Sequence, residues 1–273
     1  MSEVTFRKIF IQVVADICKN TDNVGVALSA GKDSSSVLFA LLELKKKVTA
    51  YSFHVEDIQS TDFIHAKQNA KTFKVPFVEC IIPKKVSLDN IKDLMARTGC
   101  KKKVEIECYY PYYYILPKVK ESLLLLGLGS DTFFCLSKKG MIHYSKTLDG
   151  IRKYRELDYE ITINDLERLN LLSDVGIYDP FADKRIYNYF YNKSWKEINK
   201  PRQKETLLVA FPEYFNKIKL FNQMNLQCGD SGLREIFVPL LKDRKINYKH
   251  RTRVLDLYSD IYERVNNAET VLL

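Results

Sequence analysis

Val24-Gly-Val-Ala-Leu-Ser-Ala-Gly-Lys-Asp-Ser-Ser-Ser-Val-Leu-Phe-Ala-Leu-Leu42 is the stretch that decides the fold. Its first residues are mostly apolar with β-branched side chains at alternate positions, which predicts a buried strand. Residues 29–35 are small and polar, and helical apolar spacing begins after Ser34. A strand that passes through a tight polar loop into a helix N-terminus forms an anion site. The backbone N–H groups there are unpaired, and the helix dipole favours negative charge.

A Walker phosphate loop does not fit this stretch. That loop needs Gly, four residues and then Gly-Lys-Ser/Thr, whereas five residues separate Gly25 from Gly31, and Asp33 stands at the hydroxyl position. The segment Ser29-Ala-Gly-Lys-Asp-Ser-Ser35 instead resembles the Ser-Gly-Gly-x-Asp-Ser loop of the PP-loop ATP pyrophosphatases. A Ser- and Gly-rich turn without a ligand is the alternative.

The PP-loop resemblance implies that ATP is cut between its α- and β-phosphates, that AMP is transferred to a substrate oxygen, and that pyrophosphate leaves. Hydroxyl and N–H groups of the loop would bind the pyrophosphate, and Asp33 would help to hold Mg²⁺, which spreads the charge of the leaving group. The loop residues expected to bind ATP or pyrophosphate are Leu28, Ser29, Ala30, Gly31, Ser34 and Ser35.

Length and composition indicate one large α/β domain, or one domain with a helical extension. The chain has 273 residues, of which 46% are hydrophobic, with only 10 Gly and 8 Pro, so a substantial core is available. No apolar run, Leu123–Leu126 included, approaches the length of a membrane span. The N-terminus shows an amphipathic helical stripe in place of a signal peptide, and we expect a cytoplasmic protein without membrane contact. Six cysteines without a Cys-x-x-Cys pair give little support for zinc or cluster binding.

A formal net charge of +9 leaves nucleic acid open as a partner. The aromatic cluster Tyr109–Tyr114 could stack bases. Such clusters are more often the packed face of a helix, and we favour a core role here. Charge alone does not decide the point, because solvated helix faces around an ATP site give the same balance.

Strands and helices alternate along the first half of the chain. After a helix within residues 1–20, strands are expected at Val24–Ser29, Val48–Val55, Val75–Ile82 and Glu121–Leu126. This spacing predicts an α/β fold with a doubly wound parallel sheet. The PP-loop resemblance implies that the sheet is of the HUP/PP-loop type. We assign residues 1–150 to a nucleotide-binding core and residues 151–273 to a helical part that forms the acceptor-binding wall. Ligands of such sheets lie beyond the carboxyl ends of the strands, where the Ser29–Ser35 loop falls.

A second glycine-rich turn, Gly127-Leu-Gly-Ser-Asp131, follows the last expected strand. It resembles the Gly-(Asp/Glu)-Gly-(Ala/Ser)-Asp-Glu motif in the synthetase domain of glutamine-dependent asparagine synthetases, a family that includes the β-lactam synthetases. Tyr178–Arg185 and Lys204–Phe215 resemble two later motifs of that domain. The resemblance implies that Asp131 shares the Mg²⁺–pyrophosphate site with Asp33. It also places Gly129 and Ser130 along the nucleotide, and Val55 at the adenine.

The chain departs from the family pattern at three places. Thr132 replaces the glutamate that assists the amine nucleophile, and Leu128 replaces the acidic residue between the glycines. The late Arg-x-Lys segment is expected near residues 222–224, where no lysine occurs. Because a cation is needed to stabilise charge on the α-phosphate and acyl oxygens, we expect Lys32 or Lys204 to supply it. The expected catalytic residues are therefore Asp33, Asp131, Lys32 and Lys204.

The resemblance implies an ATP- and Mg²⁺-dependent amide-forming ligase that adenylates a carboxylate or carbonyl oxygen and passes it to an amine. Because the sequence begins Met1-Ser2 without the family's nucleophilic cysteine, we expect ammonia from solution, ammonia from a glutaminase partner subunit, or a substrate amine. The expected partners are thus a small-molecule acceptor and an amine donor. Two alternatives stay open: a PP-loop enzyme that modifies a base in tRNA or DNA, and a nucleotide-binding subunit without catalysis.

Overall fold

A five-stranded parallel sheet with the order β3-β2-β1-β4-β5 organises the computed structural model. The structure describes residues 5–220, 230–243, 245 and 257–264. The strands are β1 (Asn23–Ala27), β2 (Lys47–Val55), β3 (Phe77–Ile82), β4 (Leu123–Leu125) and β5 (Gly176–Tyr178). The sheet confirms the expected α/β fold, because every strand pair is parallel.

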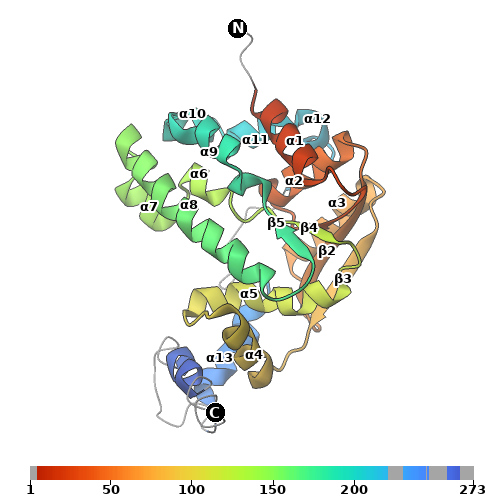
Figure 1. Cartoon of the computed structure of the whole chain (residues 1–273), viewed down its shortest axis with the longest axis vertical. Helices are drawn as coiled ribbons and strands as arrows, with labels where there is room; N and C mark the ends of the chain where they lie inside the picture. Colours follow the sequence, from red (N-terminus) through yellow and green to blue (C-terminus); the bar gives the residue numbers. More distant parts are fainter. Residues whose placement is uncertain (1–4, 221–229, 244, 246–256, 265–273) are drawn as a thin grey trace.

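Helices cover both faces of this sheet (Figure 1). On one side of the sheet lie α1 (Phe6–Ile17), α2 (Lys32–Glu43), α9 (Lys184–Tyr191), α11 (Glu205–Ala210) and α12 (Pro212–Phe215). On the opposite side lie α4 (Leu88–Thr98), α5 (Lys103–Ile115) and α13 (Leu233–Lys242). The remaining helices are α3 (Thr61–Thr72), α6 (Asp131–Phe134), α7 (Lys138–His143), α8 (Leu148–Asn170) and α10 (Trp195–Asn199), with 3₁₀ turns at Leu116–Lys118 and Pro180–Ala182.

The core is divided into two layers by the sheet, as the alternation of side chains along a strand requires. Leu123 and Leu125 of β4 pack into the layer that contains α1 and α2. Leu124 packs into the layer that contains α4 and α5. In this second layer Tyr109, Tyr110 and Tyr112 are buried, which confirms a core role for most of the tyrosine cluster. None of the described helices is long and apolar enough to cross a membrane.

The fifth strand comes from the part of the chain that we expected to be entirely helical. β5 has only three residues and pairs with β4 in parallel. Its outer edge is closed by Asn170, whose side-chain amide bonds both the N–H and the carbonyl of Ile177. The expected boundary at residue 150 falls inside α8, and the sheet therefore includes residues from both sides of it. β4 is equally short but is marked by a run of leucines, whereas β5 is Gly176-Ile-Tyr178 with a single aliphatic residue, which is why the sequence did not reveal it.

Candidate functional site

The loop between β1 and α2 folds on itself through serine hydroxyls. The Ser34 hydroxyl accepts a bond from the Ser29 N–H at 3.0 Å and lies 2.9 Å from the Ser29 hydroxyl. The Ser29 hydroxyl in turn accepts from the Gly31 N–H at 3.1 Å. A further bond runs from the Ala30 N–H to the Asp62 carboxylate at 2.9 Å, which ties the loop to the start of α3. These bonds hold the loop in one conformation at the carboxyl end of β1.

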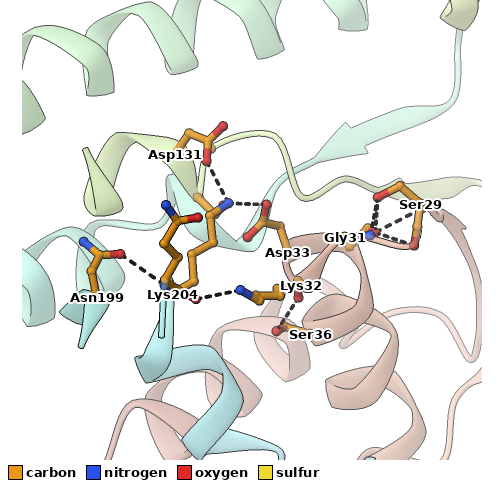
Figure 2. Close-up of polar contacts among 12 residues, drawn as sticks. Ser29, Gly31, Lys32, Asp33, Ser36, Asp131, Asn199 and Lys204 are labelled. Atoms are coloured by element: carbon orange, nitrogen blue, oxygen red, sulfur yellow. Dashed lines mark hydrogen bonds and ion pairs between the residues drawn. The ribbon is translucent and has the colours of Figure 1, made fainter. Parts of the chain in front are cut away.

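Three charged groups meet where this loop enters α2 (Figure 2). Lys204 Nζ lies 2.5 Å from Asp33 Oδ2 and 2.7 Å from Asp131 Oδ1. It also donates to the Ser130 hydroxyl at 3.1 Å. Asp33 and Lys204 are each only 5% exposed, whereas the Asp131 side chain is 57% exposed. The structure therefore brings together three of the four expected catalytic residues, from the PP-loop, the second turn and the residue that precedes α11.

The charge state of Lys204 follows from these neighbours. Burial acts to lower the pKa of its ammonium group, but the Asp33 and Asp131 carboxylates outweigh burial and raise the pKa above its ordinary value. Lys204 is therefore a permanent cation at neutral pH. It forms an electrostatic bridge between the first turn and the second.

Lys32 does not join this group. Its Nζ donates to the backbone carbonyl of Gln203 at 2.7 Å. Burial, and then repulsion from Lys204, lower the pKa of Lys32. Of the two lysines expected as the electrostatic partner, Lys204 is the one that contacts both aspartates.

An Arg-x-Lys pattern, which we expected near residues 222–224, occurs in the sequence at Arg202-Gln203-Lys204. Residues 222–224 lie outside the described part of the chain. Lys204 adopts a left-handed backbone with φ 58° and ψ 38°. Its N–H donates to the Asn199 side chain at 3.1 Å, while the Asn199 amide donates to the Phe134 carbonyl at the end of α6. Asn199, which the sequence did not single out, therefore fixes the position of Lys204 relative to the second turn.

The second turn, Gly127–Asp131, is held by another buried residue that we did not anticipate. Asp179, at the end of β5, accepts hydrogen bonds from Gly129 N–H at 2.7 Å and Phe181 N–H at 2.9 Å. Burial raises the pKa of Asp179 to about 7, although the backbone donors act to lower it. In the sequence, the only indication of this role was that Asp179 lies between Tyr178 and Pro180, directly after the residues that form β5. The strand itself was missed.

Thr132 is buried against α8. Its hydroxyl donates to the Asp158 carboxylate at 2.9 Å and lies 3.0 Å from the Thr162 hydroxyl. Burial raises the pKa of Asp158, and the negative charge of Asp131 raises it further. Leu128, the other departure from the family pattern, is 50% exposed.

Val55, the expected adenine contact, is fully buried at the end of β2. A Cβ built on Gly232 would stand 3.1 Å from the Val55 side chain, so the residues before α13 pack directly on it. Asp230 of the same segment accepts a bond from the Thr61 N–H at 2.6 Å. The C-terminal part thus lies over the carboxyl end of β2, and the adenine contact of Val55 stays a prediction.

Two polar atoms at this site are buried without a hydrogen-bond partner in the described structure, Asp33 Oδ1 and the Ser35 hydroxyl. Buried polar atoms are rarely left unpaired, because each costs about 1–3 kcal/mol. A carboxylate oxygen suits Mg²⁺, and a hydroxyl at a helix N-terminus suits a phosphate oxygen. The residues present therefore fit a metal–pyrophosphate group, with Asp33 and Asp131 as its carboxylates.

The chain is similar to one known protein family over part of its length. Residues 5–138 match the family model described as asparagine synthase. No curated protein matches the sequence significantly. Among solved structures, the U34-tRNA thiolase NcsA from Methanococcus maripaludis, with its 4Fe-4S cluster, is 17% identical, with a TM-score of 0.41 over 96% of this chain and 78% of that chain. The NMN synthetase from Francisella tularensis is 11% identical, with a TM-score of 0.34 over 82% of this chain and 100% of that chain.

The family match covers the PP-loop, the second glycine-rich turn and the four strands that precede α6. It supports the resemblance drawn from the two motifs. Over residues 5–138, just under half of its length, the chain is similar to the asparagine synthase family.

Proposed function

We propose that this protein is an ATP-dependent ligase that forms AMP and pyrophosphate. It activates a carboxylate or carbonyl oxygen of a small acceptor as its adenylate and transfers the activated group to ammonia or an amine. The observation that carries this proposal is the contact of the buried Lys204 ammonium with both Asp33 and Asp131. The unpaired Ser35 hydroxyl lies on the same first turn of α2 as Asp33.

The polar groups of the site match the charge that such a reaction develops. The Ser29–Ser35 loop, with the N-terminus of α2, provides N–H and hydroxyl donors for the pyrophosphate leaving group. Asp33 and Asp131 would hold Mg²⁺, which when bound neutralises charge on the phosphates. Lys204 provides a fixed cation for the α-phosphate and the attacking oxygen. Because Lys204 is held by Asn199 and both aspartates, little reorganisation is needed when that charge appears.

The acceptor reaches this site from the side on which Asp131 is exposed. Asp131 and Leu128 are the exposed members of the second turn, and α8 runs beside them with Asp158 and Thr162. We therefore place the acceptor and the amine between the second turn and α8. The amine source is ammonia, a glutaminase partner or an amino group on a second substrate.

A nucleotide-binding subunit without turnover is the second candidate, because Thr132 lacks the carboxylate of the family motif. Against it stands the complete set of Asp33, Asp131 and Lys204 in mutual contact, which simple binding does not require. Modification of a nucleic-acid base fits the same ATP chemistry and the net charge of +9. It differs from the leading proposal in the acceptor alone.

The test is a product assay. The protein is incubated with ATP, Mg²⁺, ammonium chloride and in turn a panel of amino acids, other carboxylates and tRNA, and AMP, ADP, pyrophosphate and phosphate are separated. We expect AMP and pyrophosphate in equal amounts with one acceptor class. ADP with phosphate contradicts the proposal, and ATP binding without AMP on any acceptor favours the subunit without turnover.

A further inference from the structure

The ammonium group of Lys204 stands where a cation shared by the two aspartates belongs. It contacts Asp33 at 2.5 Å, Asp131 at 2.7 Å and the Ser130 hydroxyl at 3.1 Å. Figure 2 shows the lysine pointing between the two carboxylates, which come from different turns. The same carboxylates are the ones that fit Mg²⁺. The position of the Lys204 ammonium group therefore overlaps the position in which Asp33 and Asp131 would hold Mg²⁺.

Lys204 cannot leave this position at low cost. Its backbone is fixed by the left-handed conformation and by the bond to Asn199. Its side chain is 6% exposed, and the ammonium group lies 5.7 Å from the centre of the Phe134 ring. A buried ammonium without a carboxylate or another anion is strongly unfavourable. A divalent cation that arrives alone must therefore displace the ammonium or bind beside it against its charge.

A nucleotide removes this obstacle because it brings its own negative charges. Phosphate oxygens next to the loop would give the ammonium new charge-assisted partners. They would also add ligands for the metal, which usually keeps phosphate oxygens and water beside one or two carboxylates. Lys204 thus disfavours binding of a free divalent cation, but it permits binding of a cation that enters together with a polyphosphate.

We infer that Lys204 makes cation binding at Asp33 and Asp131 conditional on a bound nucleotide, so that free divalent metal is excluded and the metal–nucleotide complex is selected. The inference rests on the proposed function only in taking ATP as the nucleotide. It makes Lys204 a residue that determines which form of the metal is accepted, in addition to its place beside the reacting phosphate. It is independent of the acceptor.

The test measures Mn²⁺ binding directly, by the loss of the electron paramagnetic resonance signal of free Mn²⁺ on titration. The wild-type protein is titrated with Mn²⁺ alone and with Mn²⁺ plus an ATP analogue whose α–β bridge is methylene. We expect binding only with the analogue. In Lys204→Met, Mn²⁺ alone should bind tighter by about tenfold or more, since even in a solvent-like medium one unit charge at contact distance has about that effect.

Three further variants make the result specific. Lys200→Met removes an exposed cation four residues away, which lies over the Trp195 ring, and should leave Mn²⁺ binding as in wild type. Lys204→Arg keeps the charge and should keep free Mn²⁺ out. Adding Asp131→Asn to Lys204→Met should abolish the gained binding. Circular dichroism and thermal melting show whether each variant is folded.

Two results would overturn the inference: equal affinity of wild type for Mn²⁺ with and without the analogue, or a folded Lys204→Met that gains nothing. If Lys204→Met does not fold, the inference is still tested by Mn²⁺ binding to wild type with and without the analogue, and by Mn²⁺ binding to Lys204→Arg. If wild type binds neither the analogue nor Mn²⁺ with it, the proposed ATP function fails. Gained Mn²⁺ binding in Lys204→Met would then still support exclusion by the lysine.

Discussion

Gly127 lies against the backbone of Ser34, although the two residues belong to different turns. A Cβ on Gly127 would stand 2.7 Å from the Ser34 nitrogen and 2.9 Å from the Asp33 carbonyl carbon. Both are backbone atoms in the first turn of α2, so neither can move without shifting the PP-loop. The relative position of the two turns, and with it the distance between Asp33 and Asp131, therefore depends on the missing side chain at residue 127.

We predict that Gly127→Ala separates the two turns and weakens ATP binding at least about tenfold, with a loss of stability of roughly 1–3 kcal/mol from overpacking. Isothermal titration with ATP and urea unfolding measure the two effects. Gly99→Ala is the matched control. Gly99 has φ 65° with nothing within 4 Å of its Cβ position, so it should lose only about 1 kcal/mol of stability. Unchanged ATP affinity in Gly127→Ala would contradict this coupling.

The fold was predictable because its signals are local. The first three strands carry apolar residues with β-branched side chains, and the fourth is marked by the run Leu123–Leu126. The loop at Ser29–Ser35 shows its own change from strand to helix period. The two glycine-rich turns come directly after strands, so a parallel sheet places them at the same edge. β5 was missed because Gly176-Ile-Tyr178 lacks the apolar run that marks β4, and its pairing with β4 depends on contacts distant in sequence.

The site was predictable only in part, for the same reason. Asp33 and Asp131 belong to recognisable motifs, whereas Asp179 and Asn199 act by accepting backbone N–H bonds in the folded chain. Although Asp179 lies within the Tyr178–Arg185 motif, the sequence does not show which N–H groups such an acceptor binds. Lys204 was chosen for its closeness to a motif, but its role depends on a contact with Asp33 across 171 positions.

Asp33→Asn should reduce the formation of AMP and pyrophosphate by at least about a hundredfold, the size expected when one preorganised charge is removed from a reacting centre. The variant keeps the shape of the side chain but removes a carboxylate from the cation site, and it leaves Lys204 paired with Asp131 alone. Asp57→Asn, at an exposed pair with Lys84, controls for charge and should retain full activity. Full ATP cleavage by Asp33→Asn would show that the metal assignment is wrong.

Arg155 is the buried link between α8, α6 and α9. Its guanidinium is fully buried and donates to four backbone carbonyls, those of Phe133, Phe190, Tyr191 and Lys193. Arg155→Met fills the same space but leaves these carbonyls without the donor. We predict a loss of roughly 3 kcal/mol or more in unfolding free energy, at about 1–3 kcal/mol for each buried group left unpaired.

Urea unfolding of Arg155→Met measures this loss, and Arg152→Met provides the comparison. Arg152 lies one turn earlier on α8 and bonds Asp149 and Asn192 at the surface. Exposed pairs of this kind contribute about 1 kcal/mol or less. Similar losses of unfolding free energy in the two variants would mean that the buried guanidinium of Arg155 stabilises the fold no more than the surface guanidinium of Arg152.

Asp179 should make stability depend on pH near neutrality. Burial raises its pKa from 3.8 to about 7 in the folded protein, while the unfolded chain ionises near 3.8. Between these values the folded state binds more protons than the unfolded state, so stability is highest below pH 4 and falls as pH rises to about 7. For a shift of this size the fall is roughly 4 kcal/mol, and above pH 7 this contribution is constant.

Asp179→Asn cannot ionise, so the difference in unfolding free energy between wild type and this variant isolates the effect. Urea unfolding at pH 5, 6, 7 and 8 should show wild type losing stability relative to Asp179→Asn as pH rises, with the difference levelling off above pH 7. Asp183→Asn is the control, because Arg185 lowers the pKa of Asp183 and this carboxyl is ionised in both states throughout that range. A difference that does not change with pH would mean that the N–H groups of Gly129 and Phe181 offset burial and keep Asp179 ionised. The second turn would then be held by an Asp179 carboxylate that stays ionised, and the hydrogen bond from Gly129 N–H to Asp179 would not change between pH 5 and 8.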